Sequence, residues 1–218
     1  MLKRQSASSN LRFGTLWILA TTVGLCLGMA FSVWQASGYF GPARNILQLF
    51  AAALLEMLPL SFCQWFVLRR YMKDTDWWIV TSLLASVTYY VIAAWISVQR
   101  FPGSVTLTMG FPTVSNFTIL SGAVLGLLLG SCQWLVLKRR IEQALWWIPT
   151  NVLSFAIGVA LAEELSHLLS ILMPLNGLSN PGFYPIHYAI VFVFTAGLAA
   201  LVICAITLSV LLRLLQRI

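Results

Sequence analysis

Several ionisable residues lie inside long apolar stretches of the sequence, where a charge is costly and usually has a purpose. Glu56 is preceded by "LQLFAAALL" and followed by "MLPLSFC". Glu163, Glu164 and His167 lie together in "AEELSHLLS". A carboxyl group in such a place can carry a proton or bind a polar solute, and a carboxylate beside an imidazole can bind a metal.

Glu56 is the candidate that lies deepest in its apolar segment. It precedes Trp65 by nine residues, which at about 1.5 Å per residue places it roughly 13 Å from a membrane interface. Steps of three or four residues connect it to Asn45, Gln48 and Pro59 on one helix face. We predict a ligand-binding face with Glu56, Gln48 and Asn45. The structural alternative is a protonated Glu56 that hydrogen-bonds to a neighbouring carbonyl.

The second candidate is a metal site around the double glutamate. The spacing of these residues on one helix matches that of carboxylate and histidine ligands in di-iron bundles, but such bundles take ligands from four helices. About 24 Å separates Glu163 from Trp147, so an ion pair with Arg44 or Arg100 near the membrane surface is the alternative. The four candidate metal ligands are Glu163, Glu164, His167 and His187.

The composition requires that these residues be positioned by membrane helices. Apolar residues make up 60% of the chain and charged residues 9%, more apolar surface than one soluble core can bury. About 20 apolar residues in a helix span a bilayer, because lipid offers no partners to open backbone groups. We therefore predict an all-α integral membrane bundle with six spans: 11–36, 46–68, 77–98, 117–137, 146–172 and 186–212. Residues 1–10 form a tail, and 11–218 form one transmembrane domain.

The net charge of +7 follows this topology. Only Arg44 and Arg100 fall on one side of the six spans. Short basic loops stay in the cytoplasm, so both termini are predicted to be cytoplasmic and nucleic acid is not expected as a partner. Eleven basic residues share the other side: Lys3, Arg4, Arg12, Arg69, Arg70, Lys73, Lys138, Arg139, Arg140, Arg213 and Arg217.

The central part of the chain is repeated. "CQWFVLRR", from Cys63, returns as "CQWLVLKR", from Cys132, after 69 residues, and the Trp-Trp pairs that follow keep the same offset. This predicts a parallel internal repeat of two-helix units, at about 42–110 and 111–179. The first and last helices form a third, permuted unit in one interpretation and stay unrelated in the other. Gln64 and Gln133 are candidates for ligand binding or for joining neighbouring helices, because a buried amide needs partners.

The strings "GSCQWLVLKRR" and "ALWWIPTNVLS" resemble a motif of uncharacterised polytopic membrane proteins of bacteria, especially cyanobacteria. That motif is Gly-x-x-Gln-Trp-x-Val-Leu-Arg followed by a Trp-Trp pair. The resemblance covers the central four helices, and the first copy departs from it at Ser61, where the second copy has Gly130. It implies a bacterial inner membrane, or a thylakoid membrane in a cyanobacterium, and no particular activity.

The Glu163 segment also resembles intramembrane proteases of the CAAX-processing type, which pair a double glutamate with a later Phe-x-x-x-His motif. Phe183 and His187 match the second motif. Leu168 stands where those proteases have an arginine, and the two motifs are closer together than in that family. The resemblance implies an intramembrane metalloprotease that uses Glu163, Glu164, His167 and His187.

The sequence as a whole favours a non-catalytic scaffold or binding subunit of a membrane complex. Its four cysteines are isolated, and no cofactor is expected. The expected partners are the lipid bilayer and other membrane subunits, or further copies of the chain. One alternative is a small transporter or solute-binding subunit that uses Glu56. The other is the metalloprotease-like enzyme.

Overall fold

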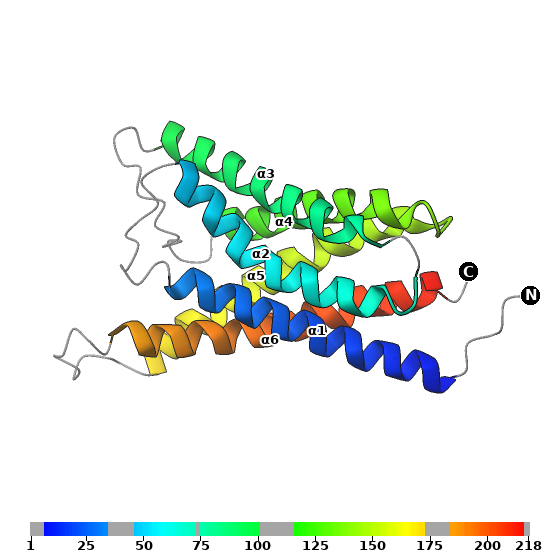
Figure 1. Ribbon diagram of the computed structural model, residues 1–218. Coiled ribbons are helices and arrows are strands. Elements are labelled where there is room, and N and C mark those ends of the chain that lie inside the picture. Colours follow the sequence, from blue (N-terminus) through cyan, green and yellow to red (C-terminus); the bar gives the residue numbers. More distant parts are fainter. Residues whose placement is uncertain (1–6, 35–45, 73–74, 101–115, 173–183, 216–218) are drawn as a thin grey trace, which may run out of the picture.

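The described residues of the chain fold into six α-helices, shown in the computed structural model in Figure 1. The structure describes residues 7–34, 46–72, 75–100, 116–172 and 184–215, and all regular structure in these ranges is helical. The prediction of an all-helical protein is confirmed. The helices are α1 (Ala7–Trp34), α2 (Ile46–Leu68), α3 (Trp77–Arg100), α4 (Asn116–Leu137), α5 (Trp147–Leu172), which follows the short 3₁₀ helix η2 (Ala144–Trp146), and α6 (Tyr184–Leu215).

Five of the helices are long and apolar enough to cross a membrane, which makes the chain a multi-pass membrane protein. In α2 the apolar stretch among the described residues is shorter, Ala53–Leu68. Its crossing of the membrane as a sixth span therefore stays a prediction. The helix α1 begins at Ala7 and includes the last four residues that the sequence assigned to the tail.

The helices form a closed ring. Each packs against the helix before it and the helix after it in the chain, and α6 completes the ring by packing against α1. The largest buried side chains lie inside this ring and come from α1, α2, α3, α4, α5 and α6 alike. A ring of this kind gives each helix one face toward the shared core and one face outward.

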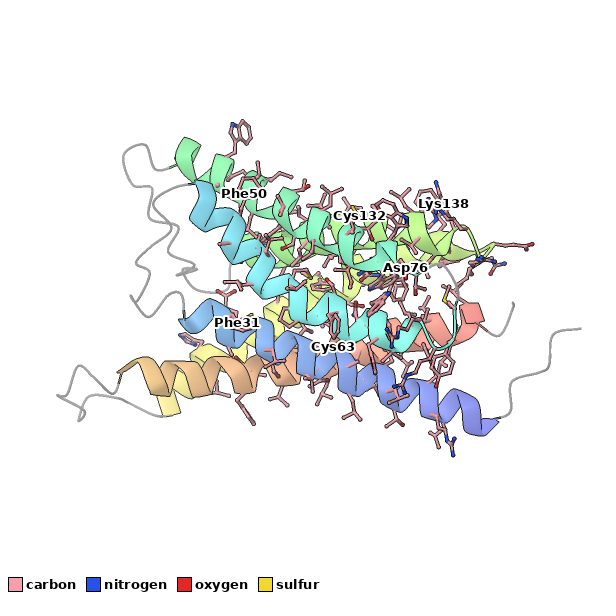
Figure 2. The ribbon with its side chains drawn as sticks, viewed as in Figure 1. Phe31, Phe50, Cys63, Asp76, Cys132 and Lys138 are labelled. Atoms are coloured by element: carbon pink, nitrogen blue, oxygen red, sulfur yellow. The ribbon has the colours of Figure 1, made fainter. Side chains whose placement is uncertain are left out.

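The two ends of the bundle differ in charge. The first turn of α1, the α2–α3 turn, the α4–α5 turn and the last turn of α6 lie at the same end, which we call the basic end (Figure 1). Figure 2 shows Asp76 and Lys138 toward this end and Phe31 and Phe50 toward the opposite, far end. The exposed basic residues described there are Arg12, Arg69, Arg70, Lys138, Arg139, Arg140 and Arg213.

The two turns at the basic end have the same backbone hydrogen bonds. In the first, the amides of Arg69 and Met72 donate to the carbonyls of Trp65 and Leu68, at 2.9 and 2.8 Å. In the second, the amides of Lys138 and Ile141 donate to Trp134 and Leu137, at 2.8 and 3.0 Å. Met72 and Ile141 are both buried, which fixes each turn against the core.

Candidate functional site

Three tryptophans pack against one another in the centre of the ring. Trp17 of α1, Trp78 of α3 and Trp147 of α5 are each at most 1% exposed. Their ring centroids are 6.2 to 6.4 Å apart for all three pairs. The contacts are tilted or edge-to-face, which aromatic rings favour because of their quadrupoles. We call this cluster the tryptophan triangle.

Each indole N–H of the triangle donates to a side chain of the helix next to it in the ring. Trp78 donates to Gln64 Oε1 at 3.3 Å, and Trp147 donates to Gln133 Oε1 at 3.0 Å. The two pairs have the same separation of 14 residues along the chain. Trp17 donates instead to Thr207 Oγ1 at 3.4 Å, across 190 residues. All three indoles are thus paired in the core.

The glutamine amides also donate to the preceding helix. Gln64 Nε2 donates to Thr21 Oγ1 of α1 at 3.3 Å, and Gln133 Nε2 donates to Ser82 Oγ of α3 at 2.9 Å. Each glutamine therefore joins three helices. Within the described residues the two glutamines bond to tryptophan and hydroxyl groups rather than to each other, and Gln133 connects the fourth helix to the third.

A small cavity lies beside the triangle. It leaves about 10 Å³ for the centre of a water molecule. Ten residues line it, five polar and five large and apolar: Thr21, Gln64, Gln133, Asn151 and Thr207, with Leu60, Leu129, Trp147, Phe155 and Ile203. A space of this size has no room for an organic solute.

Glu56 belongs to a second polar cluster, in the half of the bundle nearer the far end. Its carboxyl group accepts a hydrogen bond from the Tyr90 hydroxyl of α3. The neighbouring Tyr89 hydroxyl hydrogen-bonds to Ser121 of α4. Ser86 donates to the Ala53 carbonyl of α2 at 3.1 Å. Polar groups of α2, α3 and α4 therefore meet around Glu56, and we call this group the Glu56 cluster.

The Glu56 cluster coincides with a change in how the helices approach each other. Gly28 lies eleven residues after Trp17, and a methyl group there would collide with the Glu56 carbonyl on α2. Gly158 lies eleven residues after Trp147, and a methyl group there would lie 2.7 Å from the Ile203 side chain on α6. Tyr89 holds the corresponding place after Trp78. A tyrosine ring thus stands at the α3–α4 contact where the other two contacts have a glycine.

Two residues of the predicted ligand-binding face, Asn45 and Gln48, have no described side chain. Asn45 falls outside the described residues, and Gln48 lies in the first turn of α2, where only the backbone is described. Glu56, Pro59 and Cys63 do follow one another along α2 and are partly buried. The joint participation of Asn45, Gln48 and Glu56 in one site stays a prediction.

The Glu163 segment lies toward the far end of α5. Both carboxyl oxygens of Glu163 are buried, without a hydrogen-bond partner among the described residues, while Glu164 and His167 are exposed. His187 is in α6, where its side chain is not described. The described residues contain no group of three or more His, Cys, Asp or Glu placed to hold a metal ion. The metal and protease interpretations therefore gain no support from the described geometry.

At the basic end the repeated motif forms cation–π contacts. The Arg69 guanidinium lies 4.7 Å from the Trp65 ring centroid, and the Lys138 ammonium lies 4.6 Å from that of Trp134. In each pair the cation follows the tryptophan by four residues, the step that places two side chains on the same face of a helix. All four cysteines are free thiols.

The two tryptophans of each Trp-Trp pair have different positions, one exposed and one buried, and the sequence alone did not indicate this. Trp77 and Trp146 are 58% and 65% exposed, as interface anchors should be, but the second member of each pair belongs to the buried triangle. Tyr89, Tyr90 and Thr207 were also missed as site residues. The available signal was spacing, because the buried tryptophan follows the glutamine by 14 residues in both copies.

Comparison with known proteins finds no relative for this arrangement. No protein-family model matches the chain, and neither the curated proteins nor the solved structures include a match. The proposals below therefore depend on the residues and contacts described above.

Proposed function

We propose that the protein is a non-catalytic scaffold subunit of a bacterial membrane complex, and that a membrane helix of a partner subunit packs against the outward face of α3. In this proposal the chain crosses the inner membrane six times with both termini in the cytoplasm. The observation that carries the proposal is the placement of α3, which buries only 22% of its span, against 33% to 39% for the other four spans.

The position of α3 has a cause in its sequence. It contains no glycine, whereas α1, α4, α5 and α6 have glycines at their helix contacts, and Tyr89 stands at its contact with α4. Its outward face is apolar and carries Trp77, Val80, Leu84, Val91 and Trp95. The two tryptophans are 18 residues apart, about 27 Å along a helix, close to the thickness of a hydrocarbon core. The face therefore offers a partner helix a contact across the whole membrane.

The core of the bundle supports a packing role rather than conduction of a solute. The polar groups in and around the tryptophan triangle form hydrogen bonds that involve all six helices, and the cavity beside them is the size of a water molecule. Interhelical hydrogen bonds and close backbone contacts hold membrane bundles together in the absence of a hydrophobic driving force. A bundle whose own core is complete can offer its outer surface to another subunit.

The proposal includes an internal repeat of three two-helix units: α2–α3, α4–α5 and, in permuted order, α6–α1. The three indole bonds support it, because Thr207 of α6 and Trp17 of α1 correspond to Gln64 with Trp78 and to Gln133 with Trp147. A basic residue also follows each acceptor by six positions, as Arg70, Arg139 and Arg213. Three similar units around one axis account for the closed ring.

Site-specific photo-crosslinking in native membranes tests the scaffold proposal. A photoreactive amino acid replaces Leu84 of α3 or, as matched control, Leu153 of α5, the residue 69 positions later. The two side chains are 59% and 58% exposed. We expect a discrete protein adduct from position 84 and lipid adducts alone from position 153. Lipid adducts alone from both positions, or an adduct of two copies of this chain, would contradict a partner-subunit contact on α3.

A second candidate function, a small transporter or solute-binding subunit, is favoured by the Glu56 cluster. A carboxyl group within an apolar helix and beside two tyrosines can bind a cation or exchange a proton. Reconstituted in vesicles, the wild-type protein would then bind or move a cationic solute or protons, and Glu56→Gln would abolish this. Equal binding and flux in both proteins would exclude the function, and Glu164→Gln serves as control, because Glu164 is an exposed carboxylate outside the cluster.

A further inference from the structure

One of the three indole sites is built differently from the other two. At two sites a glutamine accepts from the tryptophan of its own hairpin and donates to the residue four positions after the tryptophan of the preceding unit, Thr21 or Ser82. At the third site Thr207 accepts from Trp17. The residue four positions after Trp147 is Asn151. A threonine has no amide that could reach Asn151.

The central cavity lies between these residues. Thr207 and Asn151 both line it, together with the two glutamines and Thr21. Asn151 Nδ2 donates to the Trp147 carbonyl at 2.8 Å, so the Oδ1 of this lining residue remains as an acceptor. Thr207 donates its hydroxyl hydrogen to the Ile203 carbonyl at 2.8 Å and accepts from Trp17, which leaves one lone pair for a further donor. Asn151 Oδ1 is thus the acceptor to which a glutamine amide would donate at this site, and Thr207, in place of that glutamine, offers a second acceptor instead of a donor.

The lining also supplies donors. Gln64 and Gln133 each use one N–H of the Nε2 group for Thr21 or Ser82, and an amide group has two. A neutral site with both acceptors and donors suits water better than an ion, because the N–H groups would repel a cation and the carbonyl oxygens an anion. The room of about 10 Å³ is at the lower limit for one water, which needs two to four polar partners.

We infer that the cavity is a binding site for one water molecule, which bridges Asn151 and Thr207 and takes the place of the third glutamine amide. The water donates to Asn151 Oδ1 and to Thr207 Oγ1, and it accepts from the glutamine N–H groups. Buried waters of this kind are part of a structure and are costly to remove. In this proposal a water molecule does at the α6–α1 pair what a glutamine amide does at the other two helix pairs.

The substitution Thr207→Gln tests this inference by supplying the missing amide. We expect Gln at 207 to accept from Trp17, donate to Asn151 and displace the water. Because the amide replaces the hydrogen bond of the water to Asn151 and no water has to be immobilised, the thermal midpoint of unfolding should rise by about 2–4 °C. High-resolution structures should show a water peak between Asn151 and Thr207 in the wild type and an amide group there in the variant.

Two matched variants separate this effect from a general gain in packing. Thr207→Val keeps the shape of threonine but removes the acceptor, and we expect a lower midpoint. Thr207→Gln combined with Asn151→Leu removes the acceptor for the new amide, and we expect the gain to disappear. A dry cavity in the wild-type structure would overturn the inference, as would a Thr207→Gln variant that is less stable and turns its amide away from Asn151.

Discussion

The half of the bundle toward the basic end and the half toward the far end differ in the residues that form their helix contacts. Toward the basic end, α1, α3 and α5 contribute equivalent tryptophans, and each indole finds an acceptor on a neighbouring helix. Toward the far end the same helices diverge, since Gly28 and Gly158 correspond to Tyr89. On the facing helices, Ala199 and Leu125 correspond to Glu56. The half toward the basic end, which we call the shared half, holds the three helix pairs in similar positions. In the half toward the far end, one helix pair differs from the other two.

This difference between the halves indicates which residues are candidates for a specific function. Contacts that all three helix pairs share can hold a ring together but cannot give one face of it a separate role. The Tyr89 ring and the Glu56 cluster occur once among the described residues, and they lie beside the helix that buries least. Both proposed functions therefore concern the surroundings of α3, and the substitutions below test the contrast between the halves.

The largest effect is expected at the glycine contact of the far half. A methyl group at Gly28 would overlap the Glu56 carbonyl, and backbone atoms cannot rotate away. We expect Gly28→Ala to lower the free energy of unfolding by about 3 kcal/mol, the upper end for overpacking. Reversible unfolding in mixed micelles measures it. Gly197→Ala is the control, because a methyl group there meets only Cys26 Sγ at 3.5 Å, and equal losses would mean that the α1–α2 contact is not rigid.

The next effect concerns the shared half. Gln133→Leu would leave the Trp147 indole and the Ser82 hydroxyl without their partner, and we expect a loss of about 2 kcal/mol. Gln64→Leu should cost less, because both of its bonds measure 3.3 Å, against 2.9 and 3.0 Å for Gln133. A double-mutant cycle with Trp147→Phe should give a coupling energy of about 1 kcal/mol. Additive losses would show that the glutamine stabilises the core without the indole bond.

A smaller effect is expected in the Glu56 cluster. Tyr90→Phe removes the hydroxyl that donates to Glu56, and we expect a loss of about 1 kcal/mol, within the range of interhelical hydrogen bonds in membranes. Glu56→Gln keeps a carbonyl acceptor for Tyr90 and should leave stability nearly unchanged. The same unfolding assay compares both. A much larger loss in Glu56→Gln than in Tyr90→Phe would make Glu56 a structural residue and weaken the solute-binding candidate.

The smallest effect is expected at the basic end. Lys138→Met removes the cation that lies 4.6 Å from the Trp134 ring but keeps an apolar stem. An exposed cation–π contact contributes about 0.5 kcal/mol, so the loss should be of that size. Arg139→Met removes a neighbouring exposed charge and should change stability less. If the two losses were the same, charge at this end would matter more than contact with the ring.

Much of the frame could be predicted from the sequence, because apolar length and charged turns determine helices in lipid. The bounds of α2 agree to the residue, and the pairing of Arg69 with Trp65 follows from i,i+4 spacing alone. The roles of Trp78 and Tyr89 could not be predicted in this way. Both depend on which face of a helix turns inward, and helices that are apolar all round give no periodic signal for that.

The closure of the ring by α6 against α1 bears on the order of assembly during synthesis. The ribosome makes α1 before α6, so the Trp17 indole lacks its Thr207 acceptor until α6 emerges. The hairpins α2–α3 and α4–α5 can each form their indole bond at once, since its partners are 14 residues apart. The α1 indole is thus paired after those of α3 and α5, and a nascent chain stays open at the α1–α6 contact until α6 has been made.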